Sequence, residues 1–444
     1  MNRMLAAVLA VSLTGTAMAQ DVPSGPARVT FIQAGTLLDR PGERPRGPST
    51  VIVRGGKIAE IRDGFVAPEA GATLVDLRDR FVLPGLIDMH VHLLGIGGDP
   101  GRSRMTALNT EAVDDVLYGV GNARATLLAG FTTVRDLGGD PRSIRALRDA
   151  IDRGDVTGPT IVNAGTAISV TGGHGDPTNG LAEPFAHAVA ELYDNTCNGP
   201  DDCRRATRRQ IGLGAQVVKI TATGGVLSNV SGGLGRAFTP QEMLAIVETA
   251  HGLGRKVAAH SHAADGTKAA LVAGVDSIEH GSFLDDEAVA LLKKTGAYLV
   301  PTEIAPVAAL AQARAGQLPP ATIPKAEAAA AAMVSSHRKA YQAGVKFAFG
   351  TDSGVSKHGI NAQEFALLVE KVGMTPAQAI RTATVAAADL LGQSDRIGTL
   401  ALGKAADLIA VAGSPLDDVR RLEAVEFVMH GGTIVRQRGT APIE

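Results

Sequence analysis

The stretch PGLIDMHVH, residues 84–92, decides how the middle of the chain folds. It opens with Pro-Gly, a pair that marks a turn, and continues as an apolar run that is typical of a buried strand. Side chains at positions i and i+2 of a strand point to the same face, so His90 and His92 can reach a single ion together. A lone His-x-His pair is a weak signal, and its meaning depends on what stands at the ends of the other strands.

Short β-branched runs alternate with long Ala- and Leu-rich stretches of helical periodicity on either side of this point. Such alternation predicts an α/β fold, a (β/α)8 TIM barrel, over residues 84–402. In this barrel the reactive side chains gather at the C-terminal ends of the strands. The eight predicted strands end near His90, Arg135, Gly165, Lys219, His260, His280, Thr302 and Gly350.

Two of the predicted helices, one between strands and one after the last strand, have boundaries that the sequence marks. Residues 240–252 follow Thr239, a plausible N-cap. Residues 375–391 precede Gly392, a plausible stop just past the last turn.

Reactive side chains stand at several of the predicted strand ends. One apolar strand carries Lys219, two end in His260 and His280, and the eighth run, FAFGTD, ends in Asp352. Buried charges are costly unless they are paired or bound to a metal, so packing alone explains this pattern poorly. The sequence predicts a metal site at these strand ends.

The two ends of the chain have a different pattern. Residues 28–83 contain four short β-like runs separated by Gly, Pro and Asp clusters, and residues 403–444 contain two more. We expect a small β-sandwich built from both termini.

Composition excludes several other classes of function. The 43 Lys and Arg residues nearly balance the 45 Asp and Glu residues, and aromatic residues make up only 3% of the chain. A nucleic-acid partner is therefore not expected, because the chain has no excess of basic residues and few aromatic side chains for stacking.

The first nineteen residues are predicted to be a secretory signal peptide. Arg3 precedes an apolar run, and the segment closes on Ala17-Met18-Ala19. We expect cleavage after Ala19 and a secreted, periplasmic protein. The run is too short to span a bilayer, and no membrane association is expected.

The only two cysteines, Cys197 and Cys203, lie six residues apart near a polar loop. In an oxidising compartment they could form a disulfide, and two free thiols are the alternative.

On these motifs the sequence resembles the metal-dependent amidohydrolase superfamily, from about residue 34 to residue 435. PGLIDMHVH is the most specific motif, GTD at 350–352 is the last, and GKAADL at 403–408 is similar to the return into the terminal β-domain. The resemblance implies two divalent ions. It assigns His90, His92 and Asp352 to one ion, His260 and His280 to the other, and Lys219, carbamylated by CO₂, to the bridge between them. Zinc suits such ligands best, although manganese or cobalt would be tolerated.

A narrower resemblance is to bacterial Xaa-Pro dipeptidases, or prolidases, and to the amidohydrolases that hydrolyse ochratoxin. The motifs are KITATGGVLS at 219–228, TGGHG at 171–175 and HGIN at 358–361. They make His174 a candidate catalytic residue that reaches the scissile carbonyl oxygen, and His358 a candidate substrate contact. Arg236, in the loop after the Lys219 strand, is the candidate partner of a substrate carboxylate.

The other histidines are given lesser roles. His262, two residues beyond His260, is a candidate supporting residue and not a predicted ligand. Four more are expected at the surface: His187, His251, His337 and His430.

The predicted function is hydrolysis of the amide bond of a dipeptide or an N-acyl amino acid. Substrates of the ochratoxin type belong to the second class. Asp352 would take a proton from water and deliver it to the departing nitrogen. The resemblance also implies a large homo-oligomer, such as an octamer. Three alternatives stay open: a single-metal cyclic amide hydrolase such as imidazolonepropionase, against which Lys219 argues; a lactone or β-lactam hydrolase; and a non-catalytic barrel.

Overall fold

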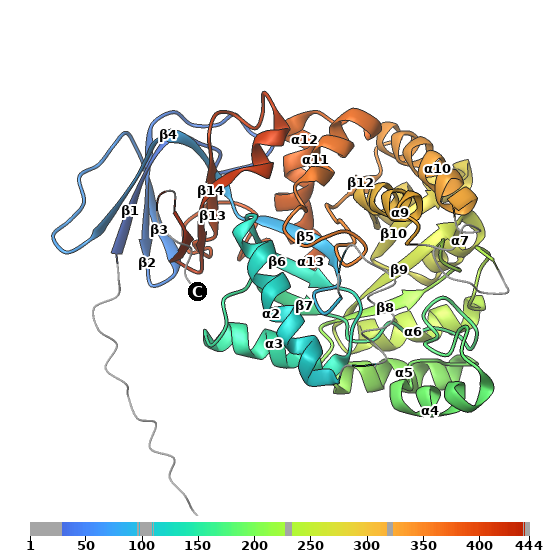
Figure 1. The fold of residues 1–444 in the computed structure, drawn as a ribbon. Coiled ribbons are helices and arrows are strands. Elements are labelled where there is room, and N and C mark those ends of the chain that lie inside the picture. Colours follow the sequence, from blue (N-terminus) through green and yellow to red (C-terminus); the bar gives the residue numbers. More distant parts are fainter. Residues whose placement is uncertain are drawn as a thin grey trace, which may run out of the picture.

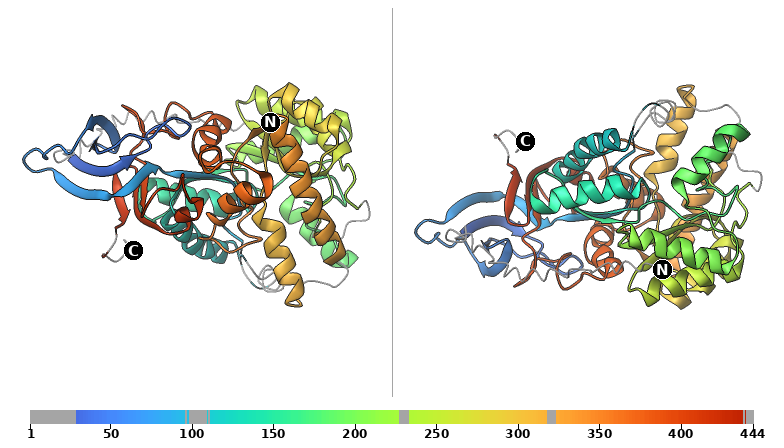
Figure 2. Two further views of the ribbon diagram at one scale, coloured as in Figure 1. Left: turned by 90° about the horizontal axis from the view of Figure 1, so that it is seen from above. Right: turned by 90° about the horizontal axis from the view of Figure 1, so that it is seen from below.

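The structure is a computed structural model that describes residues 29–95, 97, 109, 111–226, 233–317, 323–437 and 439. The predicted signal peptide lies outside the described residues. Figures 1 and 2 show two parts: a β-sheet at one end of an elongated molecule, and a larger body of strands and helices at the other.

The larger body contains the parallel strands that the sequence predicts. A three-stranded sheet has the order β5-β6-β7, and a five-stranded sheet has the order β12-β11-β10-β9-β8. Every pair within them is parallel. The strands are β5 (Leu86–Val91), β6 (Phe131–Asp136), β7 (Thr160–Asn163), β8 (Val217–Thr221), β9 (Lys256–Ala263), β10 (Ser277–Phe283), β11 (Tyr298–Val300) and β12 (Lys346–Phe347).

Single contacts join the two parallel sheets at both of their edges. Ile168, beyond β7, forms an isolated parallel bridge with Ile220 of β8, and Val91 of β5 forms one with Ser353, beyond β12. The described strands therefore follow one another in chain order around the body, but their ladders do not form one continuous closed barrel.

Helices cover the outside of these strands (Figure 1). They are α2 (Ala112–Leu128), α3 (Pro141–Arg153), α4 (Glu183–Tyr193), α5 (Pro200–Gly212), α6 (Pro240–Gly252), α7 (Ala264–Ala273), α8 (Asp286–Thr295), α9 (Ile304–Arg314), α10 (Ile323–Gln342), α11 (Gln363–Leu367), α12 (Pro376–Arg381) and α13 (Ala387–Leu391). In the described part of the chain no helix is both long enough and apolar enough to cross a membrane.

The two helix boundaries that the sequence marks are confirmed. Thr239 caps α6 in a capping box with Glu242, and Gly392 ends α13 in the left-handed conformation. The predicted helix over 375–391 differs in its middle, where a π-helical turn separates α12 from α13. There the Thr384 hydroxyl donates to the Ile380 carbonyl (2.8 Å), a bond by which Thr often bends a helix.

Strands from both ends of the chain form the second part. They are β1 (Val29–Leu37), β2 (Ser49–Arg54), β3 (Lys57–Asp63), β4 (Thr73–Pro84), β13 (Leu408–Val411), β14 (Val425–His430) and β15 (Thr433–Arg436). Their pairing makes one seven-stranded sheet, β15-β14-β13-β4-β1-β2-β3, in place of two separately paired sheets. The two ends join where β4 pairs with β13, in the register Pro84 to Leu408. Alternate residues of its strands, such as Ile32, Val51 and Phe427, share one core.

The two cysteines are joined. Cys197 and Cys203 form a disulfide in which both residues are buried, at the start of α5. Of the two alternatives that the sequence left open, the structure has the disulfide.

Candidate active site

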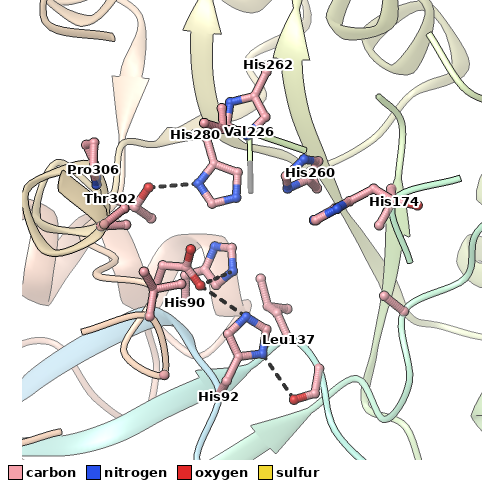
Figure 3. Close-up of a pocket in the computed structure, with 18 of the residues that line it drawn as sticks. His90, His92, Leu137, His174, Val226, His260, His262, His280, Thr302 and Pro306 are labelled. Carbon is pink, nitrogen blue, oxygen red and sulfur yellow. Dashed lines mark hydrogen bonds and ion pairs between the residues drawn. The ribbon is translucent and has the colours of Figure 1, made fainter. Parts of the chain in front are cut away.

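A cavity of about 440 Å³ opens at the C-terminal ends of the parallel strands (Figure 3). One wall is polar and comes mainly from the strand ends: His90, His92, His174, Lys219, Thr221, His260, His262, His280, Thr302 and Asp352. The other is apolar and comes mainly from α9 and α10, with contributions from loops: Leu137, Ala167, Val226, Ala305, Pro306, Ala309, Ala326, Ala329, Met333 and Val355.

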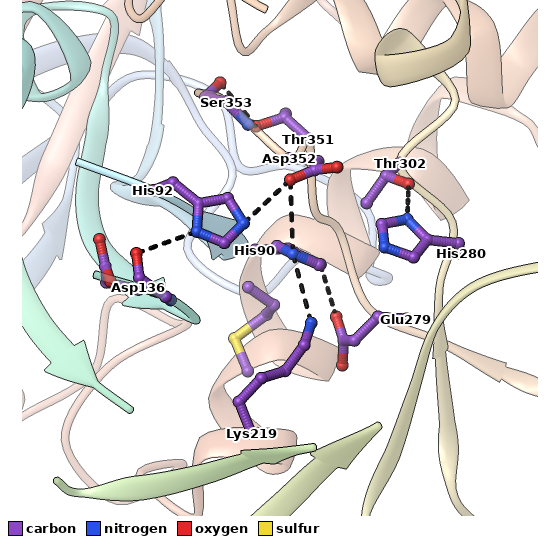
Figure 4. Close-up of polar contacts among 12 residues, drawn as sticks. His90, His92, Asp136, Lys219, Glu279, His280, Thr302, Thr351, Asp352 and Ser353 are labelled. Carbon is purple, nitrogen blue, oxygen red and sulfur yellow. Dashed lines mark hydrogen bonds and ion pairs between the residues drawn. The ribbon is translucent and has the colours of Figure 1, made fainter. Parts of the chain in front are cut away.

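Three of the polar side chains form a group that could hold a metal ion. Ligand atoms of His90, His92 and Asp352 lie within 4.8 Å of one another. Asp352 Oδ1 is 3.1 Å from His92 Nε2 and 3.5 Å from His90 Nε2 (Figure 4). Burial alone would raise the pKa of Asp352, but the two histidines outweigh it and lower that pKa. The carboxylate is therefore ionised, as a ligand must be.

Hydrogen bonds to the rear nitrogens orient both histidines. His90 Nδ1 donates to Glu279 Oε2 (3.0 Å), and His92 Nδ1 donates to the Gly138 carbonyl (3.0 Å). In each ring Nε2 is then the nitrogen that faces Asp352 in the cavity. Such rear contacts fix the tautomer of metal-binding histidines. A Cβ at Gly138 would lie 2.9 Å from the His92 ring, so only glycine fits there without displacing it.

Glu279 is a buried carboxylate behind the site, and the sequence motifs did not predict a role for it. Burial would raise its pKa, but Arg135, whose Nη2 donates to Oε1 at 2.8 Å, outweighs it and brings the pKa to about 2. Glu279 is thus a fixed negative charge at the back of His90. A glutamate directly before His280 in an apolar strand was the signal that could have identified it.

Lys219 lies deep in the cavity, where only 4% of the residue is exposed. Its Nζ is 3.5 Å from His90 Nε2 (Figure 4). Burial lowers the pKa of Lys219 to about 8, which increases the fraction of neutral amine. An uncharged amine among ligand atoms is the form that can react with CO₂.

A second group of histidines faces the first. The ring centre of His280 lies 5.1 Å from that of His90 and 4.7 Å from that of His260. His280 Nδ1 is 2.8 Å from Thr302 Oγ1. Burial lowers the pKa of His260 and of His280 well below the usual value, so both rings are neutral, the form that binds metals.

The site residues at three consecutive strand ends have strained backbones. His280 (φ 70°), Thr302 (φ 55°) and Asp352 (φ 55°) all have positive φ, although none is glycine. A residue held this way costs on the order of 1–3 kcal/mol and persists only where its surroundings impose it. The strain lies where side chains must be aimed into the cavity.

His174 extends over the second group from the loop after β7. Its ring centre is 4.3 Å from that of His260 (Figure 3), and its Nδ1 is buried without a hydrogen-bond partner among the described residues. A Cβ at Gly225 would lie 2.4 Å from the ring, so glycine at 225 makes room for it. A buried, unpartnered nitrogen in this cavity is suited to a contact with substrate.

The structure does not bring every predicted residue to the cavity. The side chains of Arg236 and His358 are absent from the described lining: Arg236 is exposed, and His358 is half-buried. His262, in contrast, lines the cavity, with Nδ1 2.7 Å from Ser282 Oγ. The prediction that His337 is a surface residue is wrong, because it is completely buried in α10.

A histidine-, lysine- and carboxylate-lined cavity at the C-terminal ends of parallel strands defines a metal-dependent hydrolase. The model of the Amidohydrolase family matches residues 81–436, and the chain belongs to that family. It is a hydrolase that acts on amide bonds.

Relatives with known activities agree with this assignment. The ochratoxinase of Aspergillus niger is 33% identical over 443 aligned positions, covering 94% of this chain and 88% of the relative. A crystal structure of a Xaa-Pro dipeptidase with methionine bound in its active site superposes with a TM-score of 0.86 at 39% identity, covering 92% of this chain and all of that one. A prolidase complexed with N-methylphosphonate-L-proline gives a TM-score of 0.83 at 30% identity, with the same coverage.

Proposed function

We propose that the protein is a two-metal hydrolase that cleaves the amide bond of dipeptides or N-acyl amino acids. The observation that carries this proposal is the convergence of six predicted ligand side chains on one buried cavity, with Lys219 beside His90. The Xaa-Pro dipeptidase, prolidase and ochratoxinase neighbours support the substrate class.

His90, His92 and Asp352 would hold one ion, and His260 and His280 the other. Lys219, as its carbamate, would supply an anionic oxygen to each. The donor set fits the group, because neutral imidazoles and carboxylates suit zinc. When bound, two such ions supply a water of lowered pKa and polarise a carbonyl oxygen.

The chain's own residues would handle the proton and the substrate. Asp352 would accept the proton from water and return it to the leaving nitrogen, a transfer that typically contributes about 10²–10⁴-fold. His174 would contact the scissile carbonyl oxygen. The apolar wall would hold a substrate side chain and exclude water.

Substrates of this class carry a carboxylate beside the scissile bond. Recognition of that carboxylate by Arg236 and His358 stays a prediction. Among the described lining residues Lys219 is the only lysine or arginine, and it is assigned to the metals. The segments 227–232 and 318–322, which follow Val226 and precede α10, lie outside the described residues.

Metal analysis combined with a substrate screen tests the proposal. Purified protein should contain two divalent metal ions per chain, with zinc the expected metal. It should release amine from dipeptides or N-acyl amino acids, and prolonged chelation should abolish turnover. Two ions with activity on lactones but not on amides would contradict the substrate class. One ion with activity on cyclic amides would contradict the two-metal site.

Three further features are proposed with this function. The parallel strands would act as one eight-stranded (β/α)8 barrel, closed through the contacts at β5 and β8. Export to the periplasm after cleavage at Ala19 is consistent with the Cys197–Cys203 disulfide. Assembly into a homo-oligomer, such as an octamer, is testable by mass photometry.

A further inference from the structure

His337 lies behind the metal cavity, and the chemistry proposed above gives it no role. It belongs to α10, the helix that also lines the cavity with Ala326, Ala329 and Met333. None of its surface is exposed. Its Nδ1 is 2.7 Å from Glu303 Oε1, and its Nε2 is 2.5 Å from the carbonyl oxygen of His280.

The bond to the His280 carbonyl lies at the point where the sheet becomes irregular. The regular register between β10 and β9 breaks after His280, where His280 and Gly281 both have positive φ. A carbonyl oxygen can only accept, so His337 Nε2 must donate to it. One helical side chain therefore holds the strained peptide that carries His280.

The position of the protons also determines how Glu303 bonds to the other side of the His337 ring. Since the Nε2 proton is committed to the carbonyl, Nδ1 either donates to an ionised Glu303 or accepts from a protonated one. In both cases one proton lies between Nδ1 and the carboxyl group. Glu303 is completely buried, and it is the only partner of Nδ1 among the described residues. Glu303 thereby fixes the orientation of the His337 ring.

A second carboxylate fixes the turn that carries Glu303. Glu364 of α11 accepts from the backbone nitrogens of Glu303 (2.9 Å) and Ile304 (2.7 Å). This turn starts at Thr302, whose hydroxyl contacts His280 Nδ1. The His280 backbone and the His280 ring are thus held by the same buried network.

We propose that His337 and Glu303 are positioning residues that hold His280 ready for the second metal ion. This inference rests on the proposed function, because it assigns His280 to that ion. Neither residue is among the described residues that line the cavity, so both act through His280. Partners of this kind typically change metal affinity by roughly 10- to 100-fold when they are removed.

Two variants of His337 separate positioning from general packing. His337→Gln places an amide donor near the position of Nε2 and can still bond the His280 carbonyl. His337→Asn places its amide near the position of Nδ1 and cannot reach that carbonyl. Zinc titration of the metal-free protein should show weaker binding of one ion in His337→Asn, by roughly 10- to 100-fold. His337→Gln should lose less than tenfold.

A positioning role also predicts that excess zinc restores most of the turnover of His337→Asn, since the chemistry is intact once the ion is bound. Glu303→Gln should bind zinc almost as the unmodified protein does, because an amide can donate to Nδ1 and leave the Nε2 proton for the carbonyl. His187→Asn, on the exposed α4, is the matched control and should change nothing.

Equal zinc affinities in His337→Asn and His337→Gln would overturn the inference. If His337→Asn does not fold, Glu303→Leu replaces it, and unchanged zinc affinity in that variant would overturn the inference equally. An unmodified protein that binds fewer than two ions would instead refute the proposed function. Two ions and normal amide hydrolysis with unaffected variants would refute the positioning role alone.

Discussion

The two walls of the cavity are built from different elements and different chemistry. The polar wall consists mostly of strand ends, where backbone ladders and rear hydrogen bonds fix His90 and His92. The apolar wall is presented mainly by α9 and α10, and alanines make up much of it. One wall is fixed by directional bonds, the other by packing.

Variants in the two walls should therefore have different effects. A change in the polar wall removes a ligand, a proton acceptor or its orientation, so it should lower metal content or kcat. A change in the apolar wall alters the shape available to a substrate side chain, so it should act through KM.

The largest effect is expected at Lys219. Lys219→Ala should lose bound metal and nearly all activity, because the bridging carbamate cannot form. Short-chain carboxylic acids added to this variant should restore part of the activity by supplying the missing oxygens. Metal analysis and rescue assays measure this. Full metal content and a normal rate would show that Lys219 is not the bridge.

The second-largest effect is expected for Asp352→Asn. The substitution preserves shape but cannot accept a proton, so kcat should fall at least about 10²-fold while the protein stays folded. Circular dichroism and thermal unfolding provide the control for folding. Near-native turnover would mean that another residue is the base.

A smaller effect is expected from blocking the carboxylate of the substrate. Converting it to an amide removes a charge-assisted hydrogen bond worth about 1.5–3 kcal/mol, so kcat/KM should fall roughly tenfold to a hundredfold. Matched free and blocked substrates measure this directly. Equal rates would move the assignment toward an esterase or lactonase.

The smallest effect is expected at the apolar wall. Met333→Ala removes about 1–2 kcal/mol of apolar contact, so KM for a bulky substrate should rise roughly five- to thirtyfold with kcat and metal content unchanged. Met374→Ala, at a buried methionine outside the cavity lining, is the matched control. A large loss of kcat in Met333→Ala, but not in Met374→Ala, would contradict the expectation that the apolar wall acts only through KM.

The polar wall was largely predictable from the sequence, and the apolar wall was not. Strand residues alternate between faces, so motifs such as PGLIDMHVH already place two side chains on one face. The described strands lie at all eight of the predicted positions. The residues that α9 and α10 present to the cavity depend on how each helix is rotated against the sheet, and an Ala-rich helix leaves that rotation undetermined.

Three single residues also show which features could not be predicted from the sequence. His337 was predicted at the surface because a helical histidine with polar neighbours gives no sign of its burial, which follows from the packing of α10 over β10. Glu279 was overlooked although it stands in a predicted strand, since its role depends on Arg135 from another strand. Arg236 was chosen for its chemistry and chain position, neither of which determines where a loop side chain points.

The seven-stranded sheet has a consequence for biosynthesis. β4 is completed only when it pairs with β13, which the ribosome makes after the entire catalytic body. Pairing between such distant segments is slow because a long loop must close first. A chain truncated before residue 408 lacks β13 and leaves that edge of β4 unpaired, and an unpaired edge strand is a site at which another chain can pair.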